Sequence, residues 1–477
     1  MTITPAPSEV PPSRELAVRA LSGGDWVDPA VVFAGGPARH PHAFWLDAGA
    51  DAATGNSYLG LGAPADVETV LAVGLGAEHV ATDAAGGALP AGIGGFRGGY
   101  VGWFGYEWGA AHAGLGPGPE AGSGAGAGAG RSIAADPAVP PAAWLRVDEF
   151  VAFDHGARRV WLVAPADRIA AFAEVVRGWI LAGEAVASTA PAAAPARVAR
   201  SGHSAAEHAE LVRECLEIIR DGDAYQLCLT TPFTVSAGPA PFDAPGMLAA
   251  LRASSPSHHA GFIRAQGTAL LSASPEQFLG VSGGRVQTRP IKGTRPRGRD
   301  AHTDAALAAE LRASTKEQAE NVMIVDLMRN DLARVCEPGS VGVDALLQVE
   351  SYAQVHQLVS TVSGRLRAGS TVSSLLAATF PAGSMTGAPK RSAMAQLRRL
   401  ERAQRGIYAG CWGYVGFDGT VDLAMVIRTI VVRGDVATVG GGGGITAGSI
   451  VDDEVREVGV KVRAPLTVLG AAVPEGW

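Results

Sequence analysis

The feature that most constrains the fold is a series of short apolar stretches, rich in β-branched and aromatic residues and bounded by turn residues. After residue 200 these stretches read AYQLCLTTPFTV, ALLSASPEQFLGV, RVQTRPI, GCWGYVGF, LAMVIRTIVVRG and VATVGGGG, and such runs are typical of β-strands. Helical spacing of apolar residues predicts helices over 205–222, which Gly222 closes, and over 303–334, 370–379 and 389–404. Strands in clusters with helices between them predict an α+β fold of layered β-sheets rather than regular βαβ alternation, and the absence of a sequence repeat excludes a solenoid.

Two low-complexity segments divide the first half of the chain. The segment GLGPGPEAGSGAGAGAG at 114–130 predicts a surface loop, and ASTAPAAAPARVARSG at 187–202 predicts a linker. The second segment suggests two regions, an N-terminal accessory region over 1–200 and a catalytic core over 201–477.

The N-terminal region carries strand-like pieces of its own, HAFWLDAG at 42–49, EFVAFD at 149–154 and VWLVAP at 160–165. Between them lies GGYVGWFGYEWG at 98–109. Its glycines predict tight packing of the backbone around aromatic side chains.

Composition and charge exclude several classes of protein. No apolar run approaches the ~20 residues of a membrane helix, and the N-terminus lacks the basic start and apolar stretch of a secretory signal. The formal net charge is −7 without a long basic tract, which argues against a nucleic-acid partner. No CxxC pair occurs, so the cysteines predict reduced, buried thiols of a cytoplasmic protein. These cysteines are Cys215, Cys228, Cys336 and Cys411.

A single lysine stands among three arginines in TRPIKGTRPRG at 288–298. Lys292 is flanked by Arg289, Arg295 and Arg297, and like charges within several Å lower the pKa of an amine. A lysine with the ordinary pKa of about 10.4 is almost entirely protonated at neutral pH, so an amine nucleophile needs such a shift. The alternative is a solvated basic loop.

Two pairs of glutamates stand at a spacing of three residues, which puts each pair on one face of a helix. Glu317 and Glu320 lie in the predicted helix at 314–335, and Glu454 and Glu457 lie near the C-terminus with Lys461 one turn beyond. Carboxylates without His or Cys suit Mg²⁺. The alternative is two solvated acidic faces.

The glycine run VGGGGGITAGS at 439–449 lacks the residues that complete a P-loop or a dinucleotide-binding motif. We therefore expect its backbone N–H groups to approach an anion rather than a nucleotide. Arg428 lies inside an apolar strand pattern and is suited to two-pronged pairing with a carboxylate.

Taken together, these pieces resemble the chorismate-utilising enzymes, which include the component I subunits of anthranilate synthase and aminodeoxychorismate synthase. The matching stretches span about 205–465 in family order, and FWLDAG and GGYVGWFGYEWG resemble the accessory region. They are SASPEQFL, RPIKGTRPRG, AENVMIVDLMRNDLARV, VHQLVSTVSG, FPAGSMTGAPK, GIYAGCWGYVGF, MVIRT and EVREVGVK. The resemblance implies the layered α+β fold of this family.

The motif PIKGT implies the subgroup that aminates carbon 4 of chorismate to give 4-amino-4-deoxychorismate, the precursor of p-aminobenzoate. In that subgroup a lysine, here Lys292, adds to carbon 2 before ammonia enters at carbon 4. Anthranilate synthases have alanine there, and isochorismate and salicylate synthases have a water-activating lysine where this chain has Gln226, whose neutral amide cannot act as a base. Anthranilate synthase component I and a catalytically silent effector-binding protein remain the alternatives.

The resemblance also assigns roles to single residues and implies partners. Glu276 is the expected general acid, and Mg²⁺ is the expected cofactor, bound by the four glutamates named above. Because no stretch resembles a glutamine amidotransferase, ammonia is expected from a separate glutaminase subunit. His356 stands beside Gln357, the position at which many anthranilate synthases have histidine. The residues expected to bind chorismate are Tyr408, Arg428, Gly442, Gly444, Lys461, Ser384 and Thr294.

Overall fold

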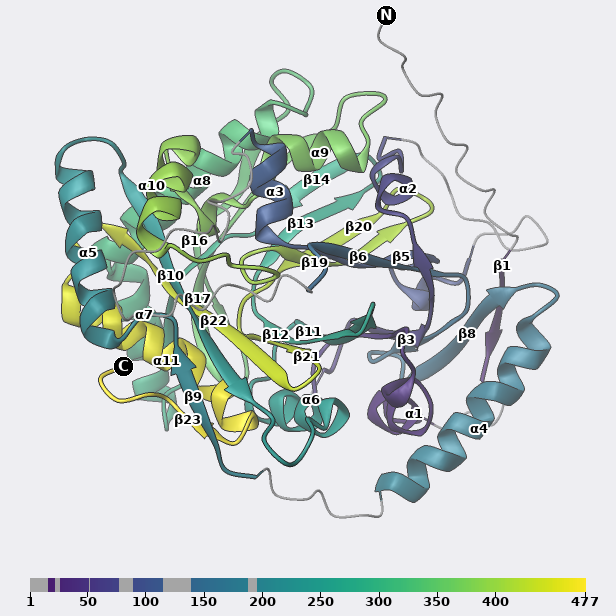
Figure 1. The fold of residues 1–477 in the computed structure, drawn as a ribbon. Coiled ribbons are helices and arrows are strands. Elements are labelled where there is room, and N and C mark those ends of the chain that lie inside the picture. Colours follow the sequence, from purple (N-terminus) through teal and green to yellow (C-terminus); the bar gives the residue numbers. More distant parts are fainter. Residues whose placement is uncertain (1–15, 22–25, 51, 77–88, 115–138, 188–194) are drawn as a thin grey trace, which may run out of the picture.

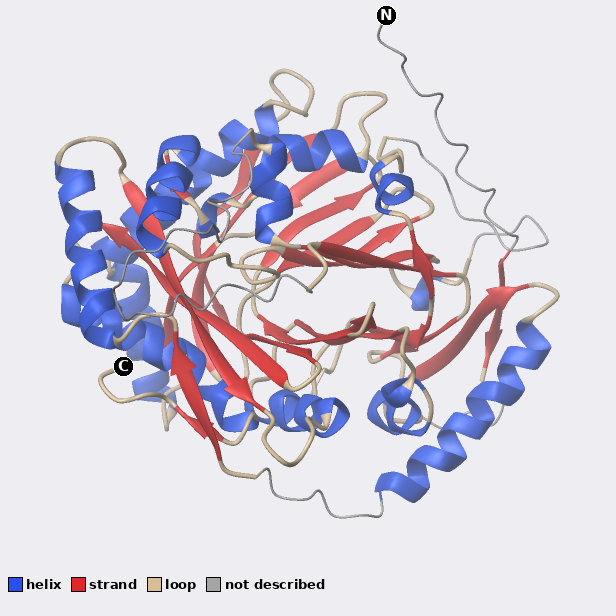
Figure 2. Ribbon diagram, in the orientation of Figure 1, coloured by secondary structure: helices blue, strands red, loops and turns tan. Residues whose placement is uncertain are grey.

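The structure consists of two stacked β-sheets with helices on their outer faces. The computed structural model describes residues 16–21, 26–50, 52–76, 89–114, 139–187 and 195–477. Within these residues one sheet has 13 strands and the other has 10. Figures 1 and 2 show the two sheets facing each other in the middle of the molecule, with the helices outside them. The predicted α+β fold of layered sheets is confirmed.

Both sheets contain strands from either side of residue 200. The larger sheet runs, in spatial order, through β1 (Leu16–Ala20), β8 (Arg159–Pro165), β7 (Phe150–Asp154), β3 (Asn56–Leu61), β2 (Ala43–Asp47), β11 (His259–Ala265), β12 (Thr268–Ser274), β21 (Thr429–Arg433), β22 (Val436–Thr446), β10 (Gln226–Ser236), β9 (Arg197–Ser201) and β23 (Ala471–Ala472), and β18 (Gly387–Ala388) pairs with β10. The smaller sheet runs through β15 (Ile291–Pro296), β17 (Val355–Arg365), β14 (Arg285–Thr288), β13 (Gln277–Ser282), β20 (Val421–Met425), β19 (Cys411–Gly416), β5 (Gly99–Phe104), β6 (Ala142–Val147) and β4 (Ala63–Ala65), and β16 (Gly342–Ser351) pairs with β17. The pairs β2–β11 and β5–β19 join the two halves of the chain.

The chain crosses between the sheets within two stretches that we predicted as single strands. ALLSASPEQFLGV is divided into β12 and β13, and LAMVIRTIVVRG into β20 and β21, with one strand of each pair in either sheet. Glu276 and Arg428 lie at these two crossings. The amide of Met425 donates to the carbonyl oxygen of Glu276 at 3.0 Å, and the amide of Ala273 donates to that of Arg428 at 3.2 Å. Backbone hydrogen bonds thus join the two crossings, and Glu276 and Arg428 both lie where the chain passes between the sheets.

The helices that we predicted follow local sequence signals, with one correction, whereas α4 (Ile169–Ala187) and α6 (Ala244–Ser254) were not predicted. The predicted helix at 205–222 is confirmed: Ser204 and Glu207 form a capping box, and Gly222 adopts a φ of +88° just beyond the end. The helix predicted over 303–334 is not continuous, because it is divided at Ser314, whose side chain accepts a hydrogen bond from the amide of Glu317 and begins a new helix. The helix predicted at 314–335 is confirmed as α8 (Thr315–Ala333).

The helices are α1 (Pro29–Gly35), α2 (Val67–Leu71), α3 (Tyr106–His112), α4 (Ile169–Ala187), α5 (Ala205–Arg220), α6 (Ala244–Ser254), α7 (Ala301–Ala313), α8 (Thr315–Ala333), α9 (Val372–Thr379), α10 (Lys390–Glu401) and α11 (Val451–Val468). Figure 1 shows α8 and α9 over the smaller sheet, and α1, α4 and α6 over the larger one, while α10 lies beside β10 of the larger sheet. The helices predicted at 370–379 and 389–404 are confirmed as α9 and α10.

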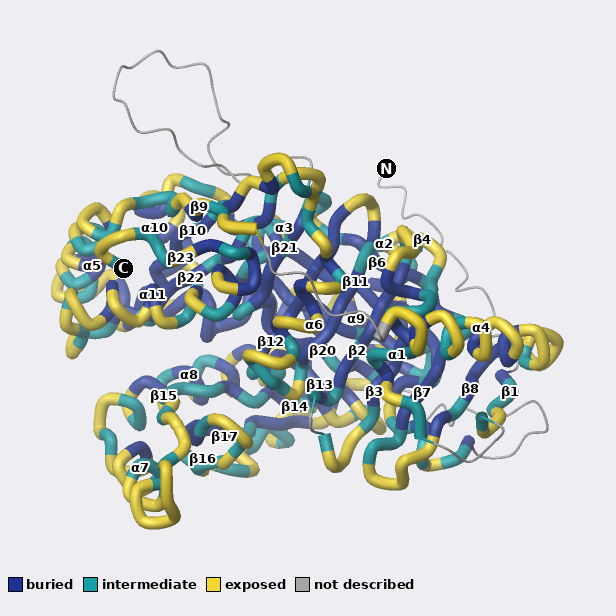
Figure 3. Tube along the Cα trace, turned by 90° about the horizontal axis from the view of Figure 1, so that it is seen from below, coloured by how far each residue is buried: buried dark blue, intermediate teal, exposed yellow. Residues whose placement is uncertain are grey.

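The hydrophobic core lies in layers between these elements. One buried cluster joins the facing sides of the two sheets and includes Phe44, Trp103, Ile263 and Trp412. Burying each such side chain contributes about 1.5–3 kcal/mol. A Cβ on Gly102 would lie 2.2 Å from the carbonyl oxygen of Ala143, which confirms the predicted close backbone packing. Figure 3 shows the strands largely buried and the exposed surface on outer helices and loops.

Several other predictions have clear outcomes. The predicted linker at 187–202 is wrong for Arg197–Ser201, which form β9 because their backbone pairs with β10 and β23, while most of the predicted loop at 114–130 lies outside the described residues. All four cysteines are buried and unbridged, as predicted. In the described parts of the chain no helix is long and apolar enough to cross a membrane.

Candidate active site

The predicted site residues meet where two strands of the larger sheet, β10 and β22, approach β15, α8 and α11. The Lys292 Nζ atom on β15 lies 3.8 Å from Glu320 Oε2 on α8. A Cβ on Gly444 of β22 would lie 3.0 Å from the same Nζ atom. Lys461 of α11 donates a hydrogen bond to the carbonyl oxygen of Gly442 at 2.8 Å. The amine of Lys292 therefore lies between α8 and β22, and Lys461 of α11 contacts the same strand β22.

Lys292 is held at this point by an irregular strand. The register between β15 and β17 shifts between Ile291 and Thr294, and Gly293 adopts a φ of +85°. A Cβ on Gly293 would lie 3.0 Å from the carboxylate of Glu317, in a backbone conformation that favours glycine. This bulge redirects the strand so that the lysine side chain is largely buried, with an exposed fraction of 15%.

The predicted effect of the three arginines on Lys292 is wrong, because each arginine has its own acidic partner. Arg289 pairs with Glu350, Arg295 with Glu310 at 2.6 Å, and Arg297 with Asp304 at 2.7 Å. Burial lowers the pKa of Lys292, but nearby carboxylates, with Glu320 the strongest, outweigh burial and raise the pKa above its ordinary value. In this arrangement Lys292 is an ammonium ion that faces the predicted metal ligands.

The four glutamates lie on α8 and α11, and each pairs with one basic side chain. These pairs are Glu317 with Arg295 (3.4 Å), Glu320 with Lys292 (3.8 Å), Glu454 with Lys316 (3.3 Å) and Glu457 with Lys461 (2.6 Å). No group of three or more His, Cys, Asp or Glu side chains within the described residues is close enough to hold a metal ion. The four carboxylates thus border one region without forming a closed ligand set.

The donor set nevertheless suits a hard divalent cation. Only carboxylate oxygens are offered, which favours Mg²⁺ over softer metals. Burial raises the pKa of Glu320 even though Lys292 and Lys316 lie near it, so its negative charge is incompletely compensated. A divalent cation between α8 and α11 would supply the missing positive charge.

Glu276 is a buried acid at the edge of the same region. It has an exposed fraction of 7% and directly precedes β13. Burial raises the pKa of Glu276 to about 7, and the opposing effects are a hydrogen bond with Ser384 and the charges of Lys292 and Lys461. At neutral pH a large share of Glu276 is therefore protonated and able to donate a proton. Ser384 is itself buried in the 3₁₀ turn Gly383–Met385.

Tyr408 and Arg428 form another side of the region. Atoms of the Tyr408 ring would lie 2.1–2.4 Å from a Cβ on Gly440, so only glycine lets the ring reach this position. Arg428 has a φ of +51°, a sparsely populated conformation for a residue other than glycine. Its guanidinium forms no ion pair with the rest of the described chain, and burial lowers its pKa. The guanidinium of Arg428 is therefore suited to binding a carboxylate of a bound ligand.

Thr294 is not brought into this cluster. It is exposed on β15 and pairs with Gln357 of β17. His356 is buried and contacts Asp304 of α7 at 3.0 Å through Nε2 and Ser351 at 2.7 Å through Nδ1. The histidine therefore joins α7 to β16 and β17.

Two residues of the site were not among those that we expected to bind chorismate or the metal, although Gln226 had served to separate the possible activities. Gln226 is fully buried, and neither polar atom of its side-chain amide has a hydrogen-bond partner within the described residues. A Cβ on Gly444 would lie 2.5 Å from Gln226 Nε2, so this amide faces the space beside Lys292. The other is Lys316, whose only sequence signal is its place directly before Glu317.

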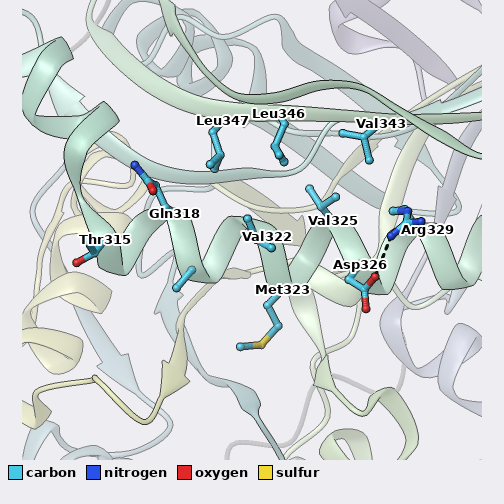
Figure 4. Close-up of a pocket in the computed structure, with 11 residues that line it drawn as sticks. Thr315, Gln318, Val322, Met323, Val325, Asp326, Arg329, Val343, Leu346 and Leu347 are labelled. Carbon is cyan, nitrogen blue, oxygen red and sulfur yellow. Dashed lines mark hydrogen bonds and ion pairs between the residues drawn. The ribbon is translucent and has the colours of Figure 1, made fainter.

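A groove of about 830 Å³ lies on the other side of α8, between this helix and β16. Figure 4 shows Val322 and Val325 of α8 facing Val343, Leu346 and Leu347 of β16. None of the predicted site residues lines this groove. The chemistry-bearing side chains are therefore on the opposite, buried side of the helix.

Comparisons with known proteins identify the family to which the chain belongs. The model of the family described as chorismate binding enzyme matches residues 76–467. An aminodeoxychorismate synthase of Streptomyces pristinaespiralis is 41% identical over 409 residues, which cover 83% of this chain and 54% of the relative. The anthranilate synthase component 1 of Streptomyces coelicolor is 39% identical over 393 residues, or 79% of this chain and 74% of the relative.

Solved structures share the fold. The crystal structure of anthranilate synthase component I from Streptococcus pneumoniae has a TM-score of 0.67 and 25% sequence identity, over 97% of this chain and 93% of that one. The chain spans about half the length of the aminodeoxychorismate synthases from Streptomyces that it matches. The family match over most of the chain and the shared fold confirm the resemblance, and the chain belongs to the family of chorismate binding enzymes.

Proposed function

We propose that this protein aminates chorismate at carbon 4, with ammonia as the nitrogen donor and Mg²⁺ as the cofactor, to give 4-amino-4-deoxychorismate. The observation that carries the proposal is the position of Lys292, a buried amine next to Glu320, Gly444 and the unpartnered amide of Gln226. The names of the curated relatives with 41% and 42% identity support it.

In the proposed reaction Lys292 and Glu276 act as a nucleophile and an acid. The amine forms a bond to carbon 2, the two ring double bonds shift, and the carbon 4 to oxygen bond breaks. Glu276 gives its proton to the departing hydroxyl, because hydroxide is a poor leaving group. Ammonia then bonds to carbon 4, the double bonds shift back and the lysine leaves, so chorismate and ammonia give the amino product and water.

Lys292 must lose its proton before it can add to the ring. Its pKa is raised mainly by Glu320, among other carboxylates. When bound, Mg²⁺ would supply positive charge to Glu317, Glu320, Glu454 and Glu457 and to a carboxylate of the substrate. The same carboxylates would then hold the lysine proton less strongly, and the buried position of Lys292 would favour the neutral amine.

The remaining side chains suit a dianionic substrate. Arg428 forms no ion pair within the described residues, so its guanidinium is available to a substrate carboxylate. Lys461 pairs with Glu457 and donates to the carbonyl oxygen of Gly442, and it would add a second positive charge for the substrate. The amide of Gln226 offers an acceptor and a donor but no basic nitrogen, which suits ammonia better than activation of water. We propose that a separate glutamine amidotransferase subunit supplies this ammonia.

The identity of the amino product tests the proposal. The purified protein is incubated with chorismate, Mg²⁺ and ammonium, and the products are separated and identified by mass spectrometry. We expect 4-amino-4-deoxychorismate, which a lyase converts to fluorescent p-aminobenzoate. Anthranilate as the main product would instead support anthranilate synthase component I, which the relatives that match over 74% and 93% of their own length favour. No amino product under these conditions would contradict both readings.

A further inference from the structure

Lysine is rare in this chain, and its positions are not those of ordinary surface residues. Of 39 basic residues only four are lysines: Lys292, Lys316, Lys390 and Lys461. Lys390 is buried against Asp331 at 2.6 Å, and each of the other three pairs with one of the four site glutamates. The other 35 basic residues are arginines. The presence of lysine rather than arginine beside three of the four glutamates therefore suggests a function for these amines.

The pair between Lys316 and Glu454 differs from the others because it joins the two helices that carry the carboxylates. Lys316 lies on α8 and Glu454 on α11, and the Nζ and Oε1 atoms are 3.3 Å apart. Within the described residues no other ion pair connects these helices. The contact is therefore the electrostatic link between the two halves of the predicted metal site.

The two partners have very different access to water. The side chain of Glu454 is 3% exposed and that of Lys316 is 44% exposed. A Cβ on Gly443 would lie 2.9 Å from Glu454 Oε2, so the carboxylate is confined against the glycine strand. A buried carboxylate that loses its only cation is strongly disfavoured, whereas a half-exposed ammonium regains its hydration by a rotation of its side chain.

We propose that Lys316 is a positioning residue that occupies the cation position beside Glu454 until a divalent cation binds, and that the cation displaces its ammonium into solvent. This inference rests on the magnesium site of the proposed function. Lys316 holds α8 and α11 together and keeps Glu454 aimed at the site, and it competes with the metal. It therefore keeps the affinity for Mg²⁺ lower than four carboxylates alone would give.

Metal binding to the Lys316→Met variant without chorismate tests this competition. Methionine keeps the apolar stem of the side chain and removes the charge. We expect Mg²⁺ to bind about 3- to 30-fold more tightly by titration calorimetry, because the competing cation is gone. In EDTA the variant should unfold at a lower temperature than the wild type, and saturating Mg²⁺ should remove most of that difference.

Arg329→Met is the matched control. It removes one positive charge from the same helix, but Arg329 pairs with the exposed Asp326 of its own helix, so its Mg²⁺ affinity should equal that of the wild type. Equal affinities in all three proteins, or weaker binding in Lys316→Met, would overturn the inference while leaving the proposed metal site intact. Absence of Mg²⁺ binding to the wild type would overturn both.

If the Lys316→Met variant does not fold, a measurement on the wild type tests whether the metal displaces Lys316 from Glu454. The four lysines are acylated with a small amine-reactive ester, and modification is quantified at each lysine by peptide mass spectrometry, with and without Mg²⁺. Release from Glu454 should speed acylation of Lys316 about threefold or more, while Lys390, which is buried against Asp331, should not respond. An unchanged rate at Lys316 in saturating Mg²⁺ would overturn the displacement.

Discussion

The ammonium of Lys292 lies 3.8 Å from the carboxylate of Glu320, and both side chains are largely buried. One residue is the proposed nucleophile and the other a proposed metal ligand, so the charge on one controls the protonation of the other. The same contact explains why burial alone does not give a neutral lysine here, and it links the covalent step to metal binding.

Replacing Lys292 tests the covalent step. Lys292→Ala should form no adduct with chorismate, whereas the wild type with Mg²⁺ and no ammonia should gain the mass of a ring-derived adduct at Lys292. Intact-protein mass spectrometry with peptide mapping measures both. Lys292→Arg retains the positive charge beside Glu320 and should also form no adduct, because a guanidinium stays protonated.

The products of Lys292→Ala carry a second expectation. If ammonia can attack carbon 2 directly in this variant, part of the product should shift toward the 2-amino isomer. A wild type without adduct, together with Lys292→Ala making the 4-amino product at the wild-type rate, would reduce the lysine to an anion-binding contact.

Glu276→Gln tests the general acid. The amide keeps the shape of the side chain but has no acidic proton, so turnover should fall by about 10²–10⁴-fold. Chorismate binding, measured by calorimetry, should be nearly unchanged. Turnover within about threefold of the wild type would mean that water or another group protonates the leaving hydroxyl.

The raised pKa of Glu276 also predicts a pH dependence of stability. Its pKa is about 7 in the folded protein against 4.5 for the free side chain, so the folded state holds this proton more tightly than the unfolded state does. The resulting stabilisation is fully present below pH 4.5 and is lost as the pH rises through about 7. Relative to Glu276→Gln, the wild type should therefore lose up to about 3 kcal/mol of unfolding free energy between acidic and mildly alkaline pH.

Urea unfolding of both proteins across this pH range, with activity measured in parallel, checks the expectation. Activity should also decline above neutral pH as the acid form is lost. A difference in stability that is the same at every pH would show that Glu276 has an ordinary pKa.

Removing the metal should stop the reaction. EDTA should abolish turnover and added Mg²⁺ should restore it. Glu457→Ala should raise the Mg²⁺ concentration needed for half-maximal activity by tenfold or more, because one of four ligands is lost. Full activity in EDTA, or an unchanged Mg²⁺ requirement in Glu457→Ala, would contradict the oxygen-only magnesium site.

Gly444→Ala tests the contact between the glycine strand and the site. The added methyl group would lie 2.5 Å from Gln226 Nε2 and 3.0 Å from Lys292 Nζ. Both atoms are ends of flexible side chains, so the fold should tolerate the change while turnover falls by at least about tenfold. Gly448→Ala, where a Cβ meets no atom within 4 Å, is the control and should behave as the wild type. Equal activity of the two variants would show that Gly444 is no part of the site.

Local sequence signals were sufficient for α5, α9 and α10, whereas α4 (Ile169–Ala187) and α6 (Ala244–Ser254) were not predicted. Ser204, Glu207 and Gly222 mark both ends of α5, because capping involves only neighbouring residues. The points at which the chain passes from one sheet to the other could not be recognised from the sequence. LAMVIRTIVVRG reads as one strand, since both β20 and β21 are apolar, and only the turn at Arg428 sends the second into the other sheet.

The sequence by itself determined the family, the layered α+β class and the motifs that carry the chemistry, because these depend on residue type and spacing. Only the tertiary structure decided which charges meet. Arg289 stands three residues from Lys292 in the sequence but pairs with Glu350, 61 residues away, while Lys292 faces Glu320 across the site. Electrostatic interactions depend on distance in space and on burial, and the packing of β15 against α8 sets both.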